Sequence, residues 1–222
     1  MMDKKKRIKH RFRLGLNLFL AGMEFWQWLS MVFVVQDGVL SATGLGSLKY
    51  FTVLSNLLEG AASLLWGLCA CREKHARLAA RVKYIAAVSV GLTFVTVLVF
   101  LGPFFGYGGM YTGSNFWFHL ILPLAAMAEF MLLNDAPMTH RDNRLAVAPM
   151  LLYGIGYLAN NLINGIGAWP HTNDFYAFLT WGYPVGMVIL VVIIVGTYGI
   201  GWLLRQANSR MLLRLAKTVR KK

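Results

Sequence analysis

Charged residues are scarce in this sequence, and acidic residues are the scarcest of them. Only 14% of the 222 residues are Asp, Glu, Lys or Arg, whereas 57% are hydrophobic. Soluble domains carry about 25% charged residues, so an ordinary soluble protein is excluded. Long apolar runs recur along the whole length and leave no stretch for a separate soluble domain. We therefore expect an all-α, polytopic membrane protein with one membrane domain over residues 1–222.

Cysteine is also rare. Cys69 and Cys71 are the only two, and they form a CxC pattern at the end of an apolar run. A structural zinc site needs four ligands, and a disulfide framework needs several cysteine pairs. The sequence therefore predicts neither a metal site nor a disulfide framework.

Six apolar segments are long enough to cross a bilayer. A hydrocarbon core of about 30 Å requires about 20 helical residues. The expected spans of this six-helix bundle are residues 14–35, 50–70, 83–102, 116–133, 145–165 and 179–204. The first span is the most polar, because Asn17, Glu24 and Gln27 lie within it.

The net charge of +13 comes from basic residues whose positions predict the orientation. Apart from Lys49, every Lys and Arg lies in the N-terminal segment, in the loops 71–83 and 134–144, or in the tail 205–222. Such clusters mark the cytoplasmic side of a membrane, so we expect both termini in the cytoplasm. The orientation in the membrane thus accounts for the positive net charge, and no nucleic-acid partner is expected. The basic tail is expected to lie on anionic lipid.

Polar side chains within the spans are candidates for function, because they are costly in a bilayer unless they face the bundle interior. The second span carries four of them at a spacing that places them on one helical face: Thr52, Asn56, Glu59 and Ser63. The fifth span carries a similar stripe: Tyr153, Tyr157, Asn160, Asn161 and Asn164. We expect both stripes to face inward.

Thr52 and His119 are expected at similar depth, because each lies a few residues into a span that runs inward from the outer side. His119 is the only histidine within an apolar run. A neutral imidazole can take the proton of a hydroxyl group, so the pair can form a nucleophile and its base. The residue types leave an alternative open, in which Thr52 bonds to its own helix and His119 bridges two helices.

Three stretches resemble a known family: KYFTVLSNLL, FWFHLILPLAAMAEF and WPHTNDFYAFLTWGYPVG. They are similar to the androgen-induced-gene and androgen-dependent TFPI-regulating proteins and their bacterial relatives, over most of the chain. The resemblance implies an intramembrane hydrolase of fatty acid esters of hydroxy fatty acids, with Thr52 as the nucleophile and His119 as the base. It implies no metal and no diffusible cofactor, and a bacterial-type relative is expected in the bacterial cytoplasmic membrane.

Supporting roles are assigned to further polar residues. The amides at the start of the second span, with Asn56, are candidates for holding an oxyanion beside Thr52. Four residues are candidates for orienting His119: Glu59, Asn160, Asn161 and Asp174. The expected partners are a lipid ester substrate and membrane lipids, while the identity of the ester and the oligomeric state are left open.

Two functions of other classes also fit the sequence. The carboxyl groups of Glu24, Glu59 and Glu129 lie within spans, where such groups can relay protons or pair with a cation in a small transporter. A non-catalytic lipid-binding protein of the same fold would use neither these groups nor the threonine. An activity probe directed at hydroxyl nucleophiles distinguishes the hydrolase from both.

Overall fold

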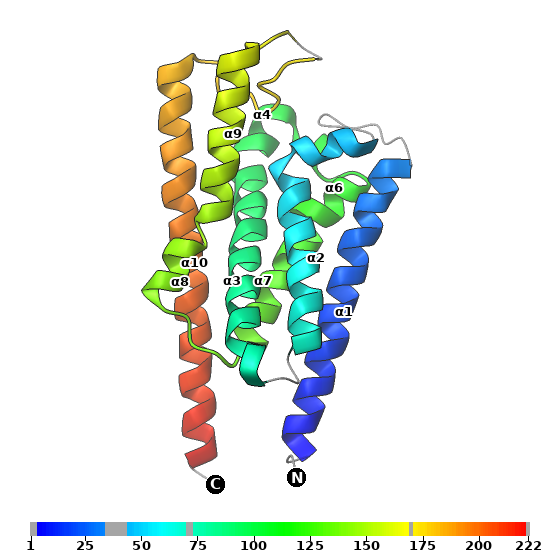
Figure 1. Cartoon of the computed structure of the whole chain (residues 1–222), viewed down its shortest axis with the longest axis vertical. Coiled ribbons are helices and arrows are strands. Elements are labelled where there is room, and N and C mark those ends of the chain that lie inside the picture. Colours follow the sequence, from blue (N-terminus) through cyan, green and yellow to red (C-terminus); the bar gives the residue numbers. More distant parts are fainter. Residues whose placement is uncertain (1–3, 34–43, 70–72, 169–170, 221–222) are drawn as a thin grey trace.

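The computed structural model describes residues 4–33, 44–69, 73–168 and 171–220. In these ranges every regular element is a helix and no strand occurs. The long helices lie side by side in an up-and-down bundle, and the two ends of the chain lie at the same end of it (Figure 1). We call this the terminal end of the bundle, and the opposite end the loop end.

The first half of the bundle makes three passes. α1 (Lys4–Phe33) runs to the loop end, where the short 3₁₀-helix η1 (Gly44–Lys49) precedes α2 (Phe51–Cys69). α3 (Glu73–Thr96) runs back from the terminal end. It continues through a π-helical turn, η2 (Val97–Leu101), into α4 (Gly102–Phe105) and is followed by α5 (Tyr107–Met110).

The second half makes three further passes. The fourth pass consists of α6 (Ser114–Phe116), the π-helical turn η3 (Trp117–Ile121) and α7 (Leu122–Leu133). The fifth consists of α8 (His140–Leu145) and α9 (Ala148–Asn164). The last is α10 (Tyr183–Arg220), which continues past the predicted end of the sixth span at 204, so within the described residues the basic tail prolongs this helix toward the terminal end (Figure 1).

Five helical stretches of the described chain are long and apolar enough to cross a membrane. They are Phe51–Cys69, Ala76–Phe105, Ser114–Leu133, His140–Asn164 and Tyr183–Arg214. The prediction of an all-helical protein with membrane-spanning helices is therefore confirmed for these five. α1 is long enough but too polar to be among them, because it carries Asn17, Glu24 and Gln27. All three side chains are buried against the rest of the bundle.

Lys83 was predicted in a loop at the cytoplasmic side, and that prediction was wrong. The helix α3 begins at Glu73, well before Lys83, and the Lys83 side chain is buried within the bundle. There it forms a salt bridge with Glu59 of α2. The charge distribution along the sequence cannot reveal this, because a lysine near the end of a span looks the same whether it faces solvent or a buried carboxylate.

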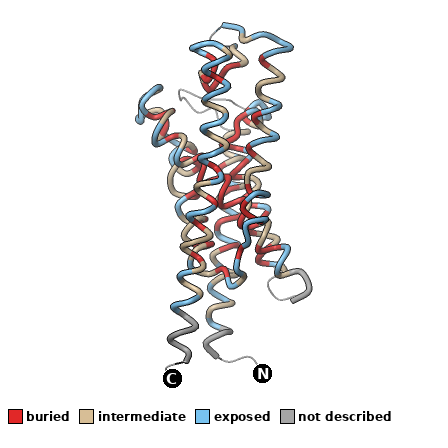
Figure 2. The backbone as a smooth tube through the Cα atoms, turned by 90° about the vertical axis from the view of Figure 1, so that its left-hand side faces the viewer, coloured by how far each residue is buried: buried red, intermediate tan, exposed pale blue. Residues whose placement is uncertain are grey.

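Buried residues concentrate along the middle of the bundle, as Figure 2 shows. One apolar cluster, which includes Phe51, Phe118 and Tyr176, surrounds the start of α2. Another, which includes Trp66 and Tyr84, lies further toward the terminal end. The buried polar face of α2 runs between the neighbouring helices, so the fold aligns its hydroxyl, amide and carboxyl groups in one column inside the bundle.

Candidate active site

Thr52 is the second residue of α2, and its side chain is almost completely buried. The helix starts there because η1 ends at Lys49, and the amide groups of Val53 and Leu54 bond back to the carbonyl group of Tyr50. The first turn of a helix leaves N–H groups without helical partners. One of them, the N–H of Phe51, donates to the phenol oxygen of Tyr176 at 2.7 Å.

His119 lies in the π-helical turn η3 and is also buried. Pro123 follows four residues later and has no N–H to donate to the His119 carbonyl, which favours the wider turn. The Nδ1 atom of His119 lies 2.7 Å from the carbonyl oxygen of Met110. Because a carbonyl only accepts, Nδ1 carries the proton, and Nε2 is the basic nitrogen of the neutral ring.

Thr52 and His119 lie on the wall of one pocket, which we call the histidine pocket. Its cavity volume is about 20 Å³. The other lining residues are Met31, Ser47, Tyr50, Val53 and Asn115. Residues 67 positions apart in the sequence are thus brought to one small space, because α2 and the pass that contains η3 both start at the loop end and run in the same direction.

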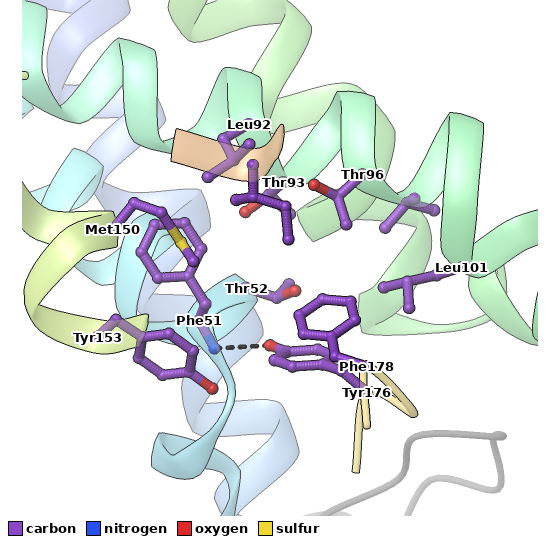
Figure 3. Close-up of a pocket in the computed structure, with 12 residues that line it drawn as sticks. Phe51, Thr52, Leu92, Thr93, Thr96, Leu101, Met150, Tyr153, Tyr176 and Phe178 are labelled. Atoms are coloured by element: carbon purple, nitrogen blue, oxygen red, sulfur yellow. Dashed lines mark hydrogen bonds between the residues drawn. The ribbon is translucent and has the colours of Figure 1, made fainter. Parts of the chain in front are cut away.

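A second pocket, with a cavity volume of about 30 Å³, lies on the other side of Thr52, and we call it the apolar pocket. Figure 3 shows the Thr52 hydroxyl pointing into this space, near the rings of Tyr176 and Phe178. Most other wall residues are aliphatic or aromatic, among them Leu101 and Met150. Thr52 is the one residue that lines both this pocket and the histidine pocket.

The apolar pocket adjoins a larger groove, of about 320 Å³, between α3, η2 and α10, which we call the α3–α10 groove. The two share four lining residues: Leu92, Thr96, Phe178 and Ile193. The groove is open to the outside of the bundle, because its lining residues Val99, Val188 and Val192 are exposed by more than 60%. Apolar side chains therefore connect the outer face of the bundle with Thr52.

The loop between α9 and α10 delivers Tyr176 to the start of α2. Asp174 fixes this loop, since its carboxylate accepts from the N–H of Leu179 at 2.9 Å and from the hydroxyl of Tyr157. Ala177 has a positive φ of 58°, which allows the tight turn between Tyr176 and Phe178. Aromatic residues next to a span usually lie at the membrane interface, but Phe175, Tyr176 and Phe178 of this loop are buried inside the bundle.

Burial raises the pKa of Tyr176 to about 12, although hydrogen bonding with the side chains of Tyr153 and Thr52 and with the backbone of Phe51 and Thr52 opposes that rise. The phenol therefore stays protonated at neutral pH. Its oxygen accepts the N–H of Phe51, and its own O–H remains able to donate. Tyr176 thus provides a neutral donor at the helix start that carries Thr52.

Asn56 holds the two predicted catalytic segments together. Its amide nitrogen donates to the carbonyl oxygens of Thr52 at 2.7 Å and Phe118 at 3.2 Å, so it ties α2 to the residue before His119. Both N–H bonds are then engaged. The structure does not support the prediction that Asn56 holds an oxyanion, because it has no donor left for one.

The four residues predicted to orient His119 have other partners. Glu59 pairs with Lys83, and Asp174 binds Tyr157 and Leu179. The amide of Asn161 donates to the carbonyl groups of Tyr157 and Asn173, and Asn160 accepts from Asn164. Within the described residues, the hydrogen bond that orients His119 comes instead from the backbone of Met110.

Sequence reasoning missed Tyr176, Lys83 and the Met110 carbonyl group. A backbone carbonyl gives no signal in residue types, and the aromatic segment around Tyr176 looked like an interfacial belt. A buried lysine near three intramembrane glutamates could have been considered, because unpaired carboxylates in a membrane need a cation. Among the described residues, no three His, Cys, Asp or Glu side chains are placed to hold a metal ion, and Cys71 lies outside them.

Comparisons with known proteins add no constraint on this arrangement. No protein-family model matches the chain, and no curated protein or solved structure shows significant similarity to it.

Proposed function

We propose that this protein is an intramembrane hydrolase of lipid esters, of the type formed between a fatty acid and a hydroxy fatty acid. The observation that carries the proposal is the position of Thr52, between the pocket that it shares with His119 and an apolar pocket that adjoins an outward-facing groove. The carbonyl group of a long-chain ester needs the base on one side and apolar space for the acyl chain on the other.

The proposal includes a sixth span and cytoplasmic termini. α1 runs alongside the apolar helices over the full height of the bundle, and its polar residues face inward (Figure 1). With α1 in the membrane, both ends of the chain are on the same side. The basic residues clustered at that end favour the cytoplasm.

In the first chemical step, the Thr52 hydroxyl attacks the ester carbonyl and its proton passes to Nε2 of His119. This forms a Thr52–carbon bond and a tetrahedral oxyanion. When the bond to the alcohol breaks, His119 returns the proton to the alcohol oxygen, and an acyl-threonine remains. Water then attacks the acyl-threonine with His119 again as the base, which releases the fatty acid and restores the Thr52 hydroxyl.

The oxyanion needs donors that are in place before the reaction. Tyr176 is the candidate, because its neutral phenol lies at the first turn of α2 and on the wall of the apolar pocket. The positive end of the helix dipole acts at the same point. Tyr176 therefore takes the role that the sequence suggested for Asn56.

The acyl chain of the ester would lie in the α3–α10 groove. The groove faces the hydrocarbon of the bilayer if α3 and α10 span it, and its walls are almost entirely aliphatic or aromatic. A lipid can then reach Thr52 sideways, without leaving the membrane. The histidine pocket, with Asn115 and Ser47 on its wall, is left for water and for the leaving alcohol.

A fluorophosphonate probe tests the proposal directly. In purified, folded protein we expect the probe to form an adduct on Thr52, found by mass spectrometry, and we expect the adduct to disappear in His119→Ala. Thr93→Val serves as a control, because Thr93 also lines the apolar pocket but not the histidine pocket. Absence of an adduct on well-folded protein would instead favour a lipid-binding protein without turnover.

A further inference from the structure

A second polar centre lies on the same face of α2, about 10 Å further along the helix from Thr52. Four charged side chains from four helices meet there, each exposed by 3% or less: Glu24, Glu59, Lys83 and Glu129. Lys83 forms salt bridges with Glu59 and, at 3.6 Å, with Glu129. Gly60 brings α1 close to α2, since a Cβ atom at this position would lie 3.3 Å from the Cβ of Glu24. We call these four residues the carboxyl cluster.

The carboxyl cluster has more acceptors than donors. Both carboxyl oxygens of Glu24 are buried without a hydrogen-bond partner, as is Oε2 of Glu59. Glu59 and Glu129 have Lys83 as a counter-charge, but no salt bridge joins Glu24 to a cation within the described residues. Glu24 instead experiences the charges of Glu59 and Lys83. Three ionised carboxylates around one ammonium group would leave uncompensated negative charge in a site that water does not reach.

A bound proton reduces both the excess of hydrogen-bond acceptors and the excess of negative charge. It removes one negative charge and turns an acceptor-only carboxylate into a group with an O–H donor. We propose that the carboxyl cluster is an intramembrane proton-binding site in which Glu24 carries the proton. This site is separate from the proposed catalytic residues and would exist in a protein without hydrolase activity.

The surroundings of Glu24 support this assignment. The charged groups that face it are Glu59 from α2, Lys83 from α3 and Glu129 from α7. η1 and η3 also contact α1. Their charged or titratable side chains are engaged elsewhere, because Lys49 lies over the rings of Tyr50 and Phe175, and His119 bonds to Met110.

Polar groups connect the carboxyl cluster with the terminal end of the bundle. Oε1 of Glu129 accepts from the Asn17 amide at 2.8 Å, and the same amide donates to the carbonyl oxygen of Arg13. Arg13 binds Asp135 at 3.1 Å, and Asp135 is 54% exposed. In the other direction, the next residue on the polar face of α2 is Asn56, whose amide hydrogens are engaged by carbonyl groups, and α1 carries the buried Gln27 three residues beyond Glu24. The hydrogen bonds through Asn17 favour exchange of the proton through the terminal end.

Infrared spectroscopy of the purified full-length protein in lipid nanodiscs tests the site. At neutral pH we expect the carbonyl-stretching band of a protonated carboxylic acid, with a shift in heavy water, and we expect its loss in Glu24→Gln. Glutamine has the same shape and supplies its own N–H donors, so the variant should fold. Asp135→Asn, which removes an exposed carboxyl group, should keep the band.

Two outcomes overturn the proposal. One is a parent protein without the band. The other is a band that persists in Glu24→Gln, and its loss in Glu59→Gln or Glu129→Gln would then assign the proton to that residue. The exchange route has its own test, because Asn17→Leu should slow the heavy-water shift, and an unchanged rate contradicts access through Asn17.

Discussion

The two polar regions along α2 differ in how their side chains are held. Around Thr52, the partners are backbone groups: the Met110 carbonyl for His119, the Phe51 amide for Tyr176 and two carbonyls for Asn56. Around Lys83, charged side chains bind one another. Backbone partners fix the orientation of His119 and Tyr176, and the side chains of Thr52 and His119 remain on pocket walls. Side-chain ion pairs use up the reactive groups themselves. The first pattern suits chemistry on a ligand, and the second suits structure or a bound proton.

The sharpest test of this difference is removal of the groups that face the pockets. Thr52→Ala and His119→Ala should each lower lipid ester hydrolysis by about 10⁴-fold, because each removes a partner in the same proton transfer. Thermal unfolding should change little. Initial rates with a long-chain ester measure the effect, and Thr96→Val, in the wall of the apolar pocket, is the matched control. Near-parental rates in correctly folded Thr52→Ala would end the catalytic interpretation of this region.

The opposite result is expected for the carboxyl cluster. Lys83→Met should lower the free energy of unfolding by about 3–5 kcal/mol, because it leaves the buried carboxylate of Glu59 without its cation. The double variant Lys83→Met, Glu59→Gln should recover part of this loss, since Glu59 is then neutral, although Glu129 still lacks its cation. Denaturation of the three proteins in one detergent measures the difference. Equal stability of the single variant and the parent would mean that the ion pair contributes nothing.

The phenol of Tyr176 should contribute to the loss of stability at alkaline pH. Its pKa is raised from 10.0 to about 12 by burial, so the folded state holds the proton more tightly than the unfolded state. The resulting stabilisation, about 3 kcal/mol for two pH units, is fully present below pH 10 and is lost as the pH rises through 12. Tyr176→Phe should remove this part of the alkaline decline. A decline of equal size in the variant would assign it to other groups.

The same variant tests the proposed oxyanion donor. Tyr176→Phe should reduce kcat by about 10²-fold with a smaller change in KM, since the lost O–H acts mainly on the transition state. Phe178→Leu is a suitable comparison, because Phe178 lies in the same wall and its ring stacks on that of Tyr176 but carries no hydroxyl. Steady-state kinetics on both variants separate a role in catalysis from a role in packing the aromatic loop.

The smallest effect is expected in the α3–α10 groove. Gly196 lines it, and a Cβ atom there would meet nothing within 4 Å, so Gly196→Phe is expected to place its ring in the groove. Hydrolysis of long-chain esters should fall by about tenfold while short-chain esters are unaffected, because the lost contacts are apolar and distant from the carbonyl. Gly199→Phe, on the same helix and also without neighbours within 4 Å, should have no such selectivity.

Much of the architecture could be predicted from hydrophobic runs. The second to sixth predicted segments each correspond to a helix long and apolar enough to span a membrane. The inward face of α2 followed from the spacing of Thr52, Asn56 and Glu59, all of which are buried. The individual partners could not be predicted, since Lys83 was placed in a loop and Asp174 was considered a partner of His119. Both errors concern contacts between segments distant in the sequence.

The sequence by itself determined which segments are helical and which helix faces are polar, because in an apolar environment the backbone must satisfy its own hydrogen bonds and polar side chains must turn inward. Only the tertiary structure decided what those inward groups bind. Packing of α1, α2, η3 and the loop before α10 brings His119 to Met110 and Tyr176 to Phe51, and it encloses Lys83 among three carboxyl groups. Such pairings depend on the rotation and the depth of each helix. Several combinations of rotation and depth bury the same polar faces, so the pairing is decided only when the whole bundle is packed.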